Sequence, residues 1–251
     1  MEIGFFWHYL ILFIIGIFPC IIWLLFYLRQ DVHPESNAKV LEIFILGALC
    51  VPLIALIENK IENFVSNLFP NLFFTGQSNP TNLQIFLYYI LIIGFWEEFF
   101  KYLIVKIRVI NSSHFDEPID AMLYLIIAGL GIAASENVSS IIHLPQINEA
   151  IYLSILRLAT AIFLHTLAAG ILGFFLALSL RFKKTKKIFI IFSGIAIASI
   201  FHGVYDGFLT KIENATSLFD FLIPIGIIAL MALILYFFLI KVKKLPRSCE
   251  V

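Results

Sequence analysis

The chain of 251 residues is 61% hydrophobic and 14% charged, and its mean hydropathy is +0.98. Soluble domains carry roughly 25% charged residues, so a water-soluble globular protein is excluded. Lys plus Arg and Asp plus Glu both number 17, which leaves no net charge to attract nucleic acid. The composition therefore predicts a polytopic membrane protein, with the lipid bilayer and not nucleic acid as its surroundings.

Long apolar runs predict an all-α fold, a polytopic bundle of about seven transmembrane helices that forms a single integral membrane domain over residues 1–251. Between the second and third runs, Glu58–Asn82 is irregularly apolar and predicts an interfacial segment. The predicted spans, in chain order, are Ile3–Leu28, Leu41–Ile57, Leu83–Val105, Ile119–Ile142, Ile151–Leu180, Ile188–Leu209 and Phe219–Ile240.

Positive residues predict the orientation, because Lys and Arg near the ends of spans stay on the cytoplasmic side. With the N-terminus outside, the inner segments collect 13 Lys and Arg residues, whereas the outer segments hold only Lys60 and Lys211. This difference predicts an outer N-terminus and an inner C-terminus. Arg157, near the outer end of the fifth run, is predicted to extend to the interface.

Polar side chains within the third to sixth runs give the main functional signal. A charge at the bilayer centre costs about 2.5 to 3.5 kcal/mol on insertion scales, so each one needs a partner, a watery cavity or a function. Their recurrence on successive spans predicts a shared polar site. The residues concerned are Glu97, Glu98, Lys101, Glu136, Asn137, His165, His202 and Asp206.

The spacing in the third run predicts how its charges are arranged. Glu97 and Lys101 are four residues apart and are predicted to pair, which leaves Glu98, about 100° around the helix, free of the lysine. A buried pair of carboxylates beside a lysine suits general-base catalysis. The alternative is a structural ion pair that neutralises itself.

His202 and Asp206 are also four residues apart, which predicts an imidazole oriented by a carboxylate for proton transfer or oxyanion binding. A histidine in a packing contact is the alternative. His165, considered alone, fits an interhelical hydrogen bond equally well. Gly203 and Gly207 have the small-xxx-small spacing that predicts close helix approach.

The depths of these residues do not match in straight helices. At 1.5 Å per residue, Glu97 and His165 lie roughly 21 Å from the outer ends of their spans. Glu136 and His202 lie only about 9 to 11 Å from the outer ends of theirs, and contact with water near a helix end is an alternative for Glu136. A single site therefore requires tilted or bent helices.

The ordered set Glu97-Glu98-x-x-Lys101, Glu136-Asn137, His165 and His202-x-x-x-Asp206 resembles the PrsW family of intramembrane proteases. The segment Asp116-Glu117-Pro118-Ile119-Asp120 also resembles the loop that precedes the family's fourth span. The likeness predicts a PrsW-like catalytic core at about residues 83–210. The family is similar in turn to the superfamily of CAAX prenyl endopeptidases and bacteriocin-processing proteins.

The resemblance implies hydrolysis of peptide bonds in or at the edge of the membrane, by water that a glutamate activates. It implies that Glu97 or Glu98 is the general base and that Lys101 tunes it. His165 and His202 would stabilise the oxyanion or move protons. Asp206 would orient His202, and Glu136 and Asn137 would complete the polar cavity.

A metal site is the main alternative to this mechanism, since some relatives are described as metalloproteases. Zinc is the metal that histidine and carboxylate ligands would suit. The metal-ligand candidates are Glu98, Glu136, His165 and His202, but no His-Glu-x-x-His motif is present. A cofactor-free, glutamate-dependent mechanism is favoured over a zinc-dependent one.

The expected location is the cell membrane, and the expected partner is a single-span membrane protein as substrate. The family resemblance suggests a membrane-anchored anti-sigma factor. Two other functions fit the polar spans, namely a proton- or cation-coupled transporter and a non-catalytic scaffold that binds transmembrane helices.

Overall fold

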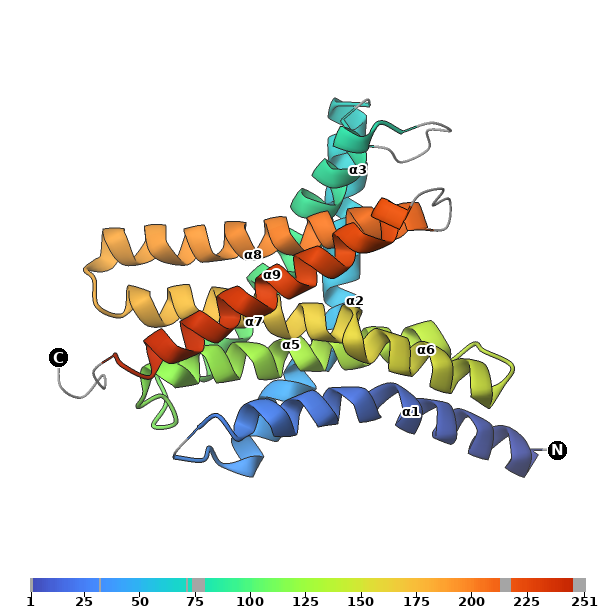
Figure 1. Ribbon diagram of the computed structural model, residues 1–251, viewed down its shortest axis with the longest axis horizontal. Helices are drawn as coiled ribbons and strands as arrows, with labels where there is room; N and C mark the ends of the chain where they lie inside the picture. Colours follow the sequence, from blue (N-terminus) through green and yellow to red (C-terminus); the bar gives the residue numbers. More distant parts are fainter. Residues whose placement is uncertain (1, 32, 71, 74–79, 213–217, 246–251) are drawn as a thin grey trace.

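The computed structural model describes residues 2–31, 33–70, 72–73, 80–212 and 218–245, which form helices and the connections between them, without a strand (Figure 1). The all-α fold is thus confirmed. The helices, in chain order, are α1 (Glu2–Leu28), α2 (Asn37–Leu68), α3 (Asn82–Tyr88), the π-helix η1 (Tyr89–Gly94), α4 (Phe95–Arg108), α5 (Pro118–Ile141), α6 (Ile147–Ala159), α7 (Ala161–Ser179), α8 (Lys184–Ile212) and α9 (Leu218–Val242).

In the described part of the chain, seven helical segments are long and apolar enough to cross a membrane, which confirms the predicted number of spans. α3, η1 and α4 together make one of these segments, and α6 and α7 make another. Figure 1 shows the start of α1 and the end of α9 at opposite ends of the helical layer, as an odd number of crossings requires.

The second span is longer than the sequence predicted, because α2 continues without a break to Leu68. The end predicted for this span at Ile57 is therefore wrong, since Glu58–Leu68 continues the same helix. The physical reason is the spacing of Ile61, Phe64, Val65 and Leu68, which recur on one face at helical intervals. Of the rest of this segment, residues 71 and 74–79 lie outside the described part of the chain.

α5 is the centre of the bundle. Its span is 94% buried, and it packs mainly against α7, α2 and α1. The crossing with α2 depends on two glycines, because a Cβ on Gly47 or on Gly131 would overlap backbone atoms of the opposite helix. This close approach brings α2 within reach of the polar residues on α5 and α4.

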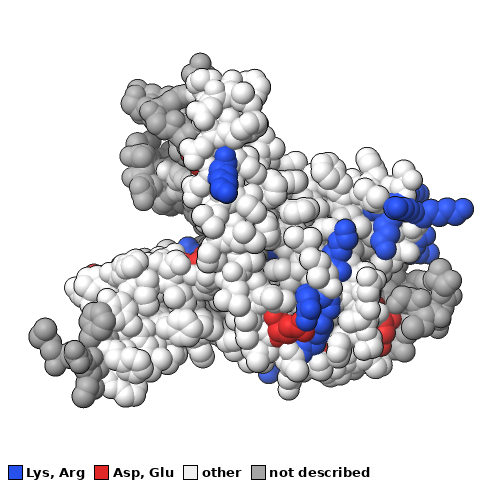
Figure 2. All heavy atoms as spheres, turned by 180° about the vertical axis from the view of Figure 1, so that it is seen from behind, with Lys and Arg blue, Asp and Glu red and all other residues white. Residues whose placement is uncertain are grey.

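The outer helices present apolar side chains to the surroundings. Only 17% of the α9 span is buried, and large side chains such as Phe18, Leu49 and Phe237 are exposed. Figure 2 shows wide uncharged areas, with most of the Lys and Arg side chains gathered on one side of the face that it draws. An exposed apolar surface of this extent needs lipid around it.

Candidate active site

Seven charged or ionisable side chains from α4, α5, α7 and α8 meet in the interior of the bundle. They form the membrane site, which consists of Glu97, Glu98, Lys101, Glu136, His165, His202 and Asp206. These side chains meet despite the depth mismatch expected of straight helices, and both of the deeper residues follow an interruption in their span. η1 precedes Glu97, and a break at Thr160, between α6 and α7, precedes His165.

A glycine on α8 sets the distance between α8 and η1, the π-helix that leads into α4. A Cβ at Gly203 would lie within 2.4 to 2.5 Å of backbone atoms of Tyr89 and Ile90 in η1, so only glycine permits this approach. Gly207 likewise faces the ring of Phe86 in α3. The close contact predicted from these glycines is confirmed, and it places His202 directly against α4.

Lys101 pairs with Glu98 and not with Glu97. Its Nζ lies 2.6 Å from Glu98 Oε1, and both side chains are completely buried. The predicted Glu97–Lys101 pair is therefore wrong. Residues three and four apart both share a helix face, so the sequence allowed either pairing, and packing against α7 and α8 selected the closer spacing.

The same lysine and glutamate fix the two histidines. Lys101 Nζ donates to His165 Nδ1 at 3.2 Å, and Glu98 Oε1 accepts from His202 Nδ1 at 2.9 Å. An ammonium can only donate, so His165 Nδ1 accepts, and its Nε2–H donates to Glu136 Oε2 at 3.0 Å. Each imidazole thus has a defined orientation, with one ring nitrogen assigned to a partner on α4.

Glu97 is the carboxylate that is free of the lysine. Its Oε2 lies 3.6 Å from His165 Nδ1 and 3.5 Å from His202 Nε2. The Glu97 side chain is only 9% exposed, and this buried oxygen has no hydrogen-bond partner among the described residues. The two rings stand nearly perpendicular, with centroids 5.0 Å apart. A reacting water or an ion would fit the chemistry of this point, where one acidic oxygen faces two imidazoles.

Access to the membrane site differs between its two sides. The side chains of Glu136 and Asp206 are 28% and 22% exposed, whereas those of Glu98 and Lys101 are completely buried. Asp206 Oδ2 lies 3.4 Å from His202 Nε2, in agreement with the predicted pairing on α8. The site is therefore closed at Glu98 and Lys101 and open toward Glu136 and Asp206.

Asn137 does not enter the membrane site. Its Nδ2 donates to the backbone oxygen of Gly16 on α1 at 2.7 Å, and its Oδ1 accepts from Arg157 Nε at 2.9 Å. The predicted place of Asn137 in the polar cavity is wrong, because neighbouring residues on α5 point to different helices. Arg157 does not extend to the interface either, since it binds Asn137 and its terminal nitrogen lies 4.0 Å from Glu136.

Glu58 on α2 is a neighbour of the site that the sequence analysis missed. Its Oε1 is buried without a hydrogen-bond partner among the described residues, and it interacts electrostatically with Glu136 and His202. Its position directly after the predicted second span placed it in an interfacial segment. The helical spacing of Glu58 and Glu62, four residues apart, was the signal that could have put it on α2.

A metal ion can be tested against the ligand atoms. One donor atom from each of Glu97, His165 and His202 lies within 4.8 Å of the others, and two imidazoles with a carboxylate are a zinc ligand set. The predicted ligands Glu98 and Glu136 are not in this group, and Glu98 is bound to Lys101. The donor types fit zinc, but Lys101 already occupies His165 Nδ1, so a metal there would have to replace that hydrogen bond.

Comparisons with known proteins place the chain among membrane proteases. A family profile described as "PrsW family intramembrane metalloprotease" matches residues 35–240. Protease PrsW of Bacillus subtilis strain 168 is 29% identical over 190 residues, which cover 75% of this chain and 78% of that protein. Protease PrsW of Clostridioides difficile strain 630 is 28% identical over 205 residues, 80% of each chain.

A third relative covers more of the chain. Protease PrsW of Oceanobacillus iheyensis is 26% identical over 221 residues, which cover 87% of this chain and 92% of that protein. No solved structure matches the chain. Residues 35–240, which the family profile matches, include every residue of the membrane site and both of the spans that carry the interruptions.

Proposed function

The chain belongs to the PrsW family of intramembrane proteases, and from this premise we propose that Glu97 is the general base of a glutamate-dependent peptidase. The protein is an intramembrane endopeptidase and a multi-pass integral protein of the cell membrane. The transporter and scaffold alternatives are not favoured by this relationship. The observation that carries the proposal is Glu97 Oε2, buried between two imidazoles without a hydrogen-bond partner among the described residues.

In this mechanism the Glu97 carboxylate accepts a proton from water while the water oxygen attacks the carbonyl carbon of the scissile bond. The negative charge that develops on the carbonyl oxygen is stabilised by His202. As the carbon–nitrogen bond breaks, Glu97 returns the proton to the leaving amine. Proton transfer by a positioned carboxylate contributes about 10² to 10⁴-fold to a rate.

The remaining residues of the membrane site position these groups. Glu98 holds Lys101 and His202, and Lys101 in turn holds His165. Glu136 accepts from the other nitrogen of His165, which fixes the ring from α5. Glu98, Lys101 and Glu136 are bound to one another or to the histidines. Substituting them is therefore expected to disturb the orientation of the reacting groups.

Zinc is the second candidate, and the contacts among Glu97, His165 and His202 support it. Bound there, a zinc ion would supply a polarised water at neutral pH. In that case Glu97 would be a ligand and could not also be the free base. The two mechanisms therefore differ in their response to metal removal.

The test is cleavage of single-span membrane peptides by the purified full-length protein in detergent, with and without a strong zinc chelator. The proposal expects Glu97→Gln to lower kcat/KM by at least about 10²-fold, with folding unchanged and no effect of the chelator on the wild type. Glu149→Gln, which removes an exposed carboxylate at the start of α6, is the matched control. Loss of wild-type cleavage on chelation, restored by zinc, would replace the glutamate mechanism with the metal one.

We extend the proposal to the substrate and the orientation. The open side of the site, at Glu136 and Asp206, lies toward the end predicted to be outside, so the substrate is a single-span protein that reaches the site from there. A membrane-anchored anti-sigma factor is the proposed substrate class.

Labelling of Glu149→Cys from outside intact cells tests the orientation. The wider relationship to CAAX prenyl endopeptidases stays a prediction.

A further inference from the structure

A second group of carboxylates lies at the end of the bundle where the α1–α2 connection meets the start of α5. One oxygen atom from each of Asp31, Glu35 and Asp120 lies within 4.8 Å of the other two. We propose that this acidic cluster, defined by these three residues, binds a hard divalent cation of the Mg²⁺ or Ca²⁺ class. The proposal is independent of the peptidase mechanism.

Two members of the acidic cluster are held in place by α5. Asp120 is only 2% exposed, and its Oδ2 accepts from the backbone N–H groups of Asp116 at 3.0 Å and Glu117 at 2.7 Å. One turn further along the helix, the hydroxyl of Tyr124 donates to Glu35 Oε2 at 2.6 Å. These bonds fix carboxylates from two segments that are 85 positions apart in sequence (120 minus 35) in one place.

Asp31 supplies the observation that points to a ligand. Its Oδ1 accepts from the backbone N–H of His33 at 2.9 Å. Its Oδ2 is buried and has no hydrogen-bond partner within the part of the chain that the structure describes. A buried oxygen that carries negative charge and no donor requires a proton or a cation beside it.

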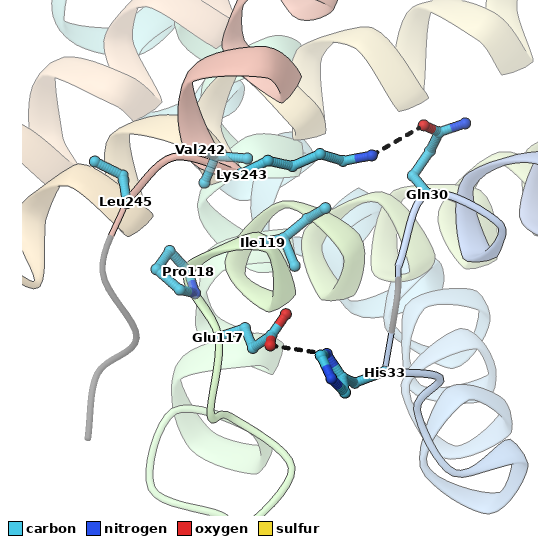
Figure 3. A pocket seen from close by; sticks show the side chains of 8 residues that line it. All are labelled: Gln30, His33, Glu117, Pro118, Ile119, Val242, Lys243 and Leu245. Atoms are coloured by element: carbon cyan, nitrogen blue, oxygen red, sulfur yellow. Dashed lines mark hydrogen bonds and ion pairs between the residues drawn. The ribbon is translucent and has the colours of Figure 1, made fainter. Parts of the chain in front are cut away.

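The protein itself supplies little positive charge here. In the described ranges, no ion pair joins Lys or Arg to Asp31, Glu35 or Asp120, and the nearest imidazole contact is 3.8 Å, between His114 and Glu35. Figure 3 shows that Lys243, in the adjoining pocket, extends to Gln30, 3.4 Å away. The counter-charge must therefore come from solution.

The electrostatics of the two residues outside the spans agree with this geometry. Burial, together with the neighbouring carboxylates Glu117 and Asp116, raises the pKa of Asp31. Burial, together with Asp31 and Asp116, raises the pKa of Glu35. Both groups are thus less stable as anions than carboxylates in water, and a bound cation would offset that repulsion.

An ion can reach the acidic cluster from solvent. A cavity of about 480 Å³ lies beside it, lined by residues of the α1–α2 and α4–α5 connections that include Glu35, His114 and Asp116. On the other side of His33 lies the pocket of about 300 Å³ that Figure 3 shows, where His33 pairs with Glu117 at 2.9 Å. The cluster is therefore fixed by α5 and open to water.

Ligand chemistry selects the class of cation. Three carboxylates offer only oxygen, the donor that Mg²⁺ and Ca²⁺ prefer. A neighbouring set, formed by Asp31, His33 and Glu117, also lies within 4.8 Å but includes a ring nitrogen, which suits softer transition metals. Because Asp31 is common to both sets, Asp120 and His33 distinguish between them.

The experiment is thermal unfolding and calorimetric titration of the full-length protein in detergent, stripped with EDTA and then titrated with Ca²⁺ or Mg²⁺. We expect one ion per chain for at least one of the two metals. At saturation, the unfolding midpoint should rise by about 5 °C. Asp31→Asn and Asp120→Asn keep the hydrogen-bond acceptors but remove one charge each, and each should weaken binding at least tenfold.

Three control variants make the result specific. His33→Ala, Glu97→Gln and the exposed Glu149→Gln should each retain the metal-dependent rise of the wild type. The proposal would be overturned if the wild type bound neither metal. It would also be overturned if Asp31→Asn and Asp120→Asn bound the metal as tightly as the wild type. Loss in His33→Ala with retention in Asp120→Asn would assign the ion to the neighbouring set instead. Because the readout is binding, a failed peptidase mechanism would not affect it.

Discussion

The membrane site and the acidic cluster contain the same kinds of carboxylate but obtain their counter-charge differently. Within the membrane site, Glu98 binds Lys101, and Glu136 binds His165 with Arg157 nearby. In the acidic cluster the described residues provide no such Lys or Arg partner to Asp31, Glu35 or Asp120.

The difference follows from the surroundings of the two groups. Lipid offers no counter-ions, so a charge deep in a span needs a partner within the protein, as Glu98 has on its own helix and Glu136 has on α7. At the end of the bundle, an aqueous cavity can deliver a proton or a cation. Glu98 and Glu136 are thus compensated by side chains of the bundle, whereas the acidic cluster is left to solvent.

The largest expected effect comes from removing the internal counter-charge. Lys101→Met leaves Glu98 buried without its ammonium partner and should lower the free energy of unfolding by about 3 to 5 kcal/mol. Peptidase activity should be lost as well, because His165 loses the donor that holds it. Chemical unfolding in detergent measures the first effect.

The double variant Glu98→Gln/Lys101→Met is the control for that prediction. With both charges removed, it should recover part of the lost stability. If it is no more stable than Lys101→Met alone, the two side chains are not coupled. Lys101 would then not be the counter-charge that distinguishes the membrane site from the acidic cluster. Lys243→Met, near the acidic cluster but bound to Gln30, should change stability little.

Arg157 should have the next largest effect. Arg157→Gln removes a charged donor from Asn137 and the only Arg near Glu136 among the described residues. The expected loss is about 1.5 to 3 kcal/mol of stability, with a lower kcat/KM because Glu136 orients His165. Arg157→Lys should restore more of the activity than of the stability. Equal stability of Arg157→Gln and the wild type would return this residue to the interfacial role that the sequence suggested.

The close contact of α8 with η1 tests how rigidly the membrane site is held. Gly203→Ala would force a Cβ against the backbone of Tyr89 and Ile90 and should lower stability by about 1 to 3 kcal/mol. Gly226→Ala, where no atom lies within 4 Å of the added Cβ, is the matched control and should stabilise α9 slightly. Equal behaviour of the two variants would show that this contact does not hold His202 in place.

The smallest expected effect is the pH dependence of the acidic cluster in EDTA. Because the folded-state pKa of Asp31 and of Glu35 is raised, the stability that these groups contribute is present below the ordinary carboxyl range and lost as pH rises through the raised values. The unfolding midpoint of the wild type should therefore fall relative to that of Asp31→Asn as the pH rises above about 4. Parallel curves would contradict the prediction.

Much of the membrane site could be anticipated from sequence, because a charge in an apolar run is conspicuous in lipid. Glu97, Lys101 and His202 were predicted on that basis, and the close approach at Gly203 was predicted from its spacing to Gly207. The errors concern direction. The partner of Lys101 and the destination of Asn137 depend on how the side chains pack against neighbouring helices, and periodicity along a single helix does not specify this. Glu58 was missed because the second span was ended too early, although its helical spacing to Glu62 continues α2.

The sequence by itself determined the all-α fold, the seven spans and the residues that needed partners, since hydrophobic length and the expense of charge in lipid act locally. The tertiary structure decided which residues meet. Glu97 and His165, which follow η1 and the break at Thr160, meet His202, and the α1–α2 connection brings Asp31 to the start of α5. These outcomes depend on contacts between segments far apart in the chain, and such contacts form only when the helices pack.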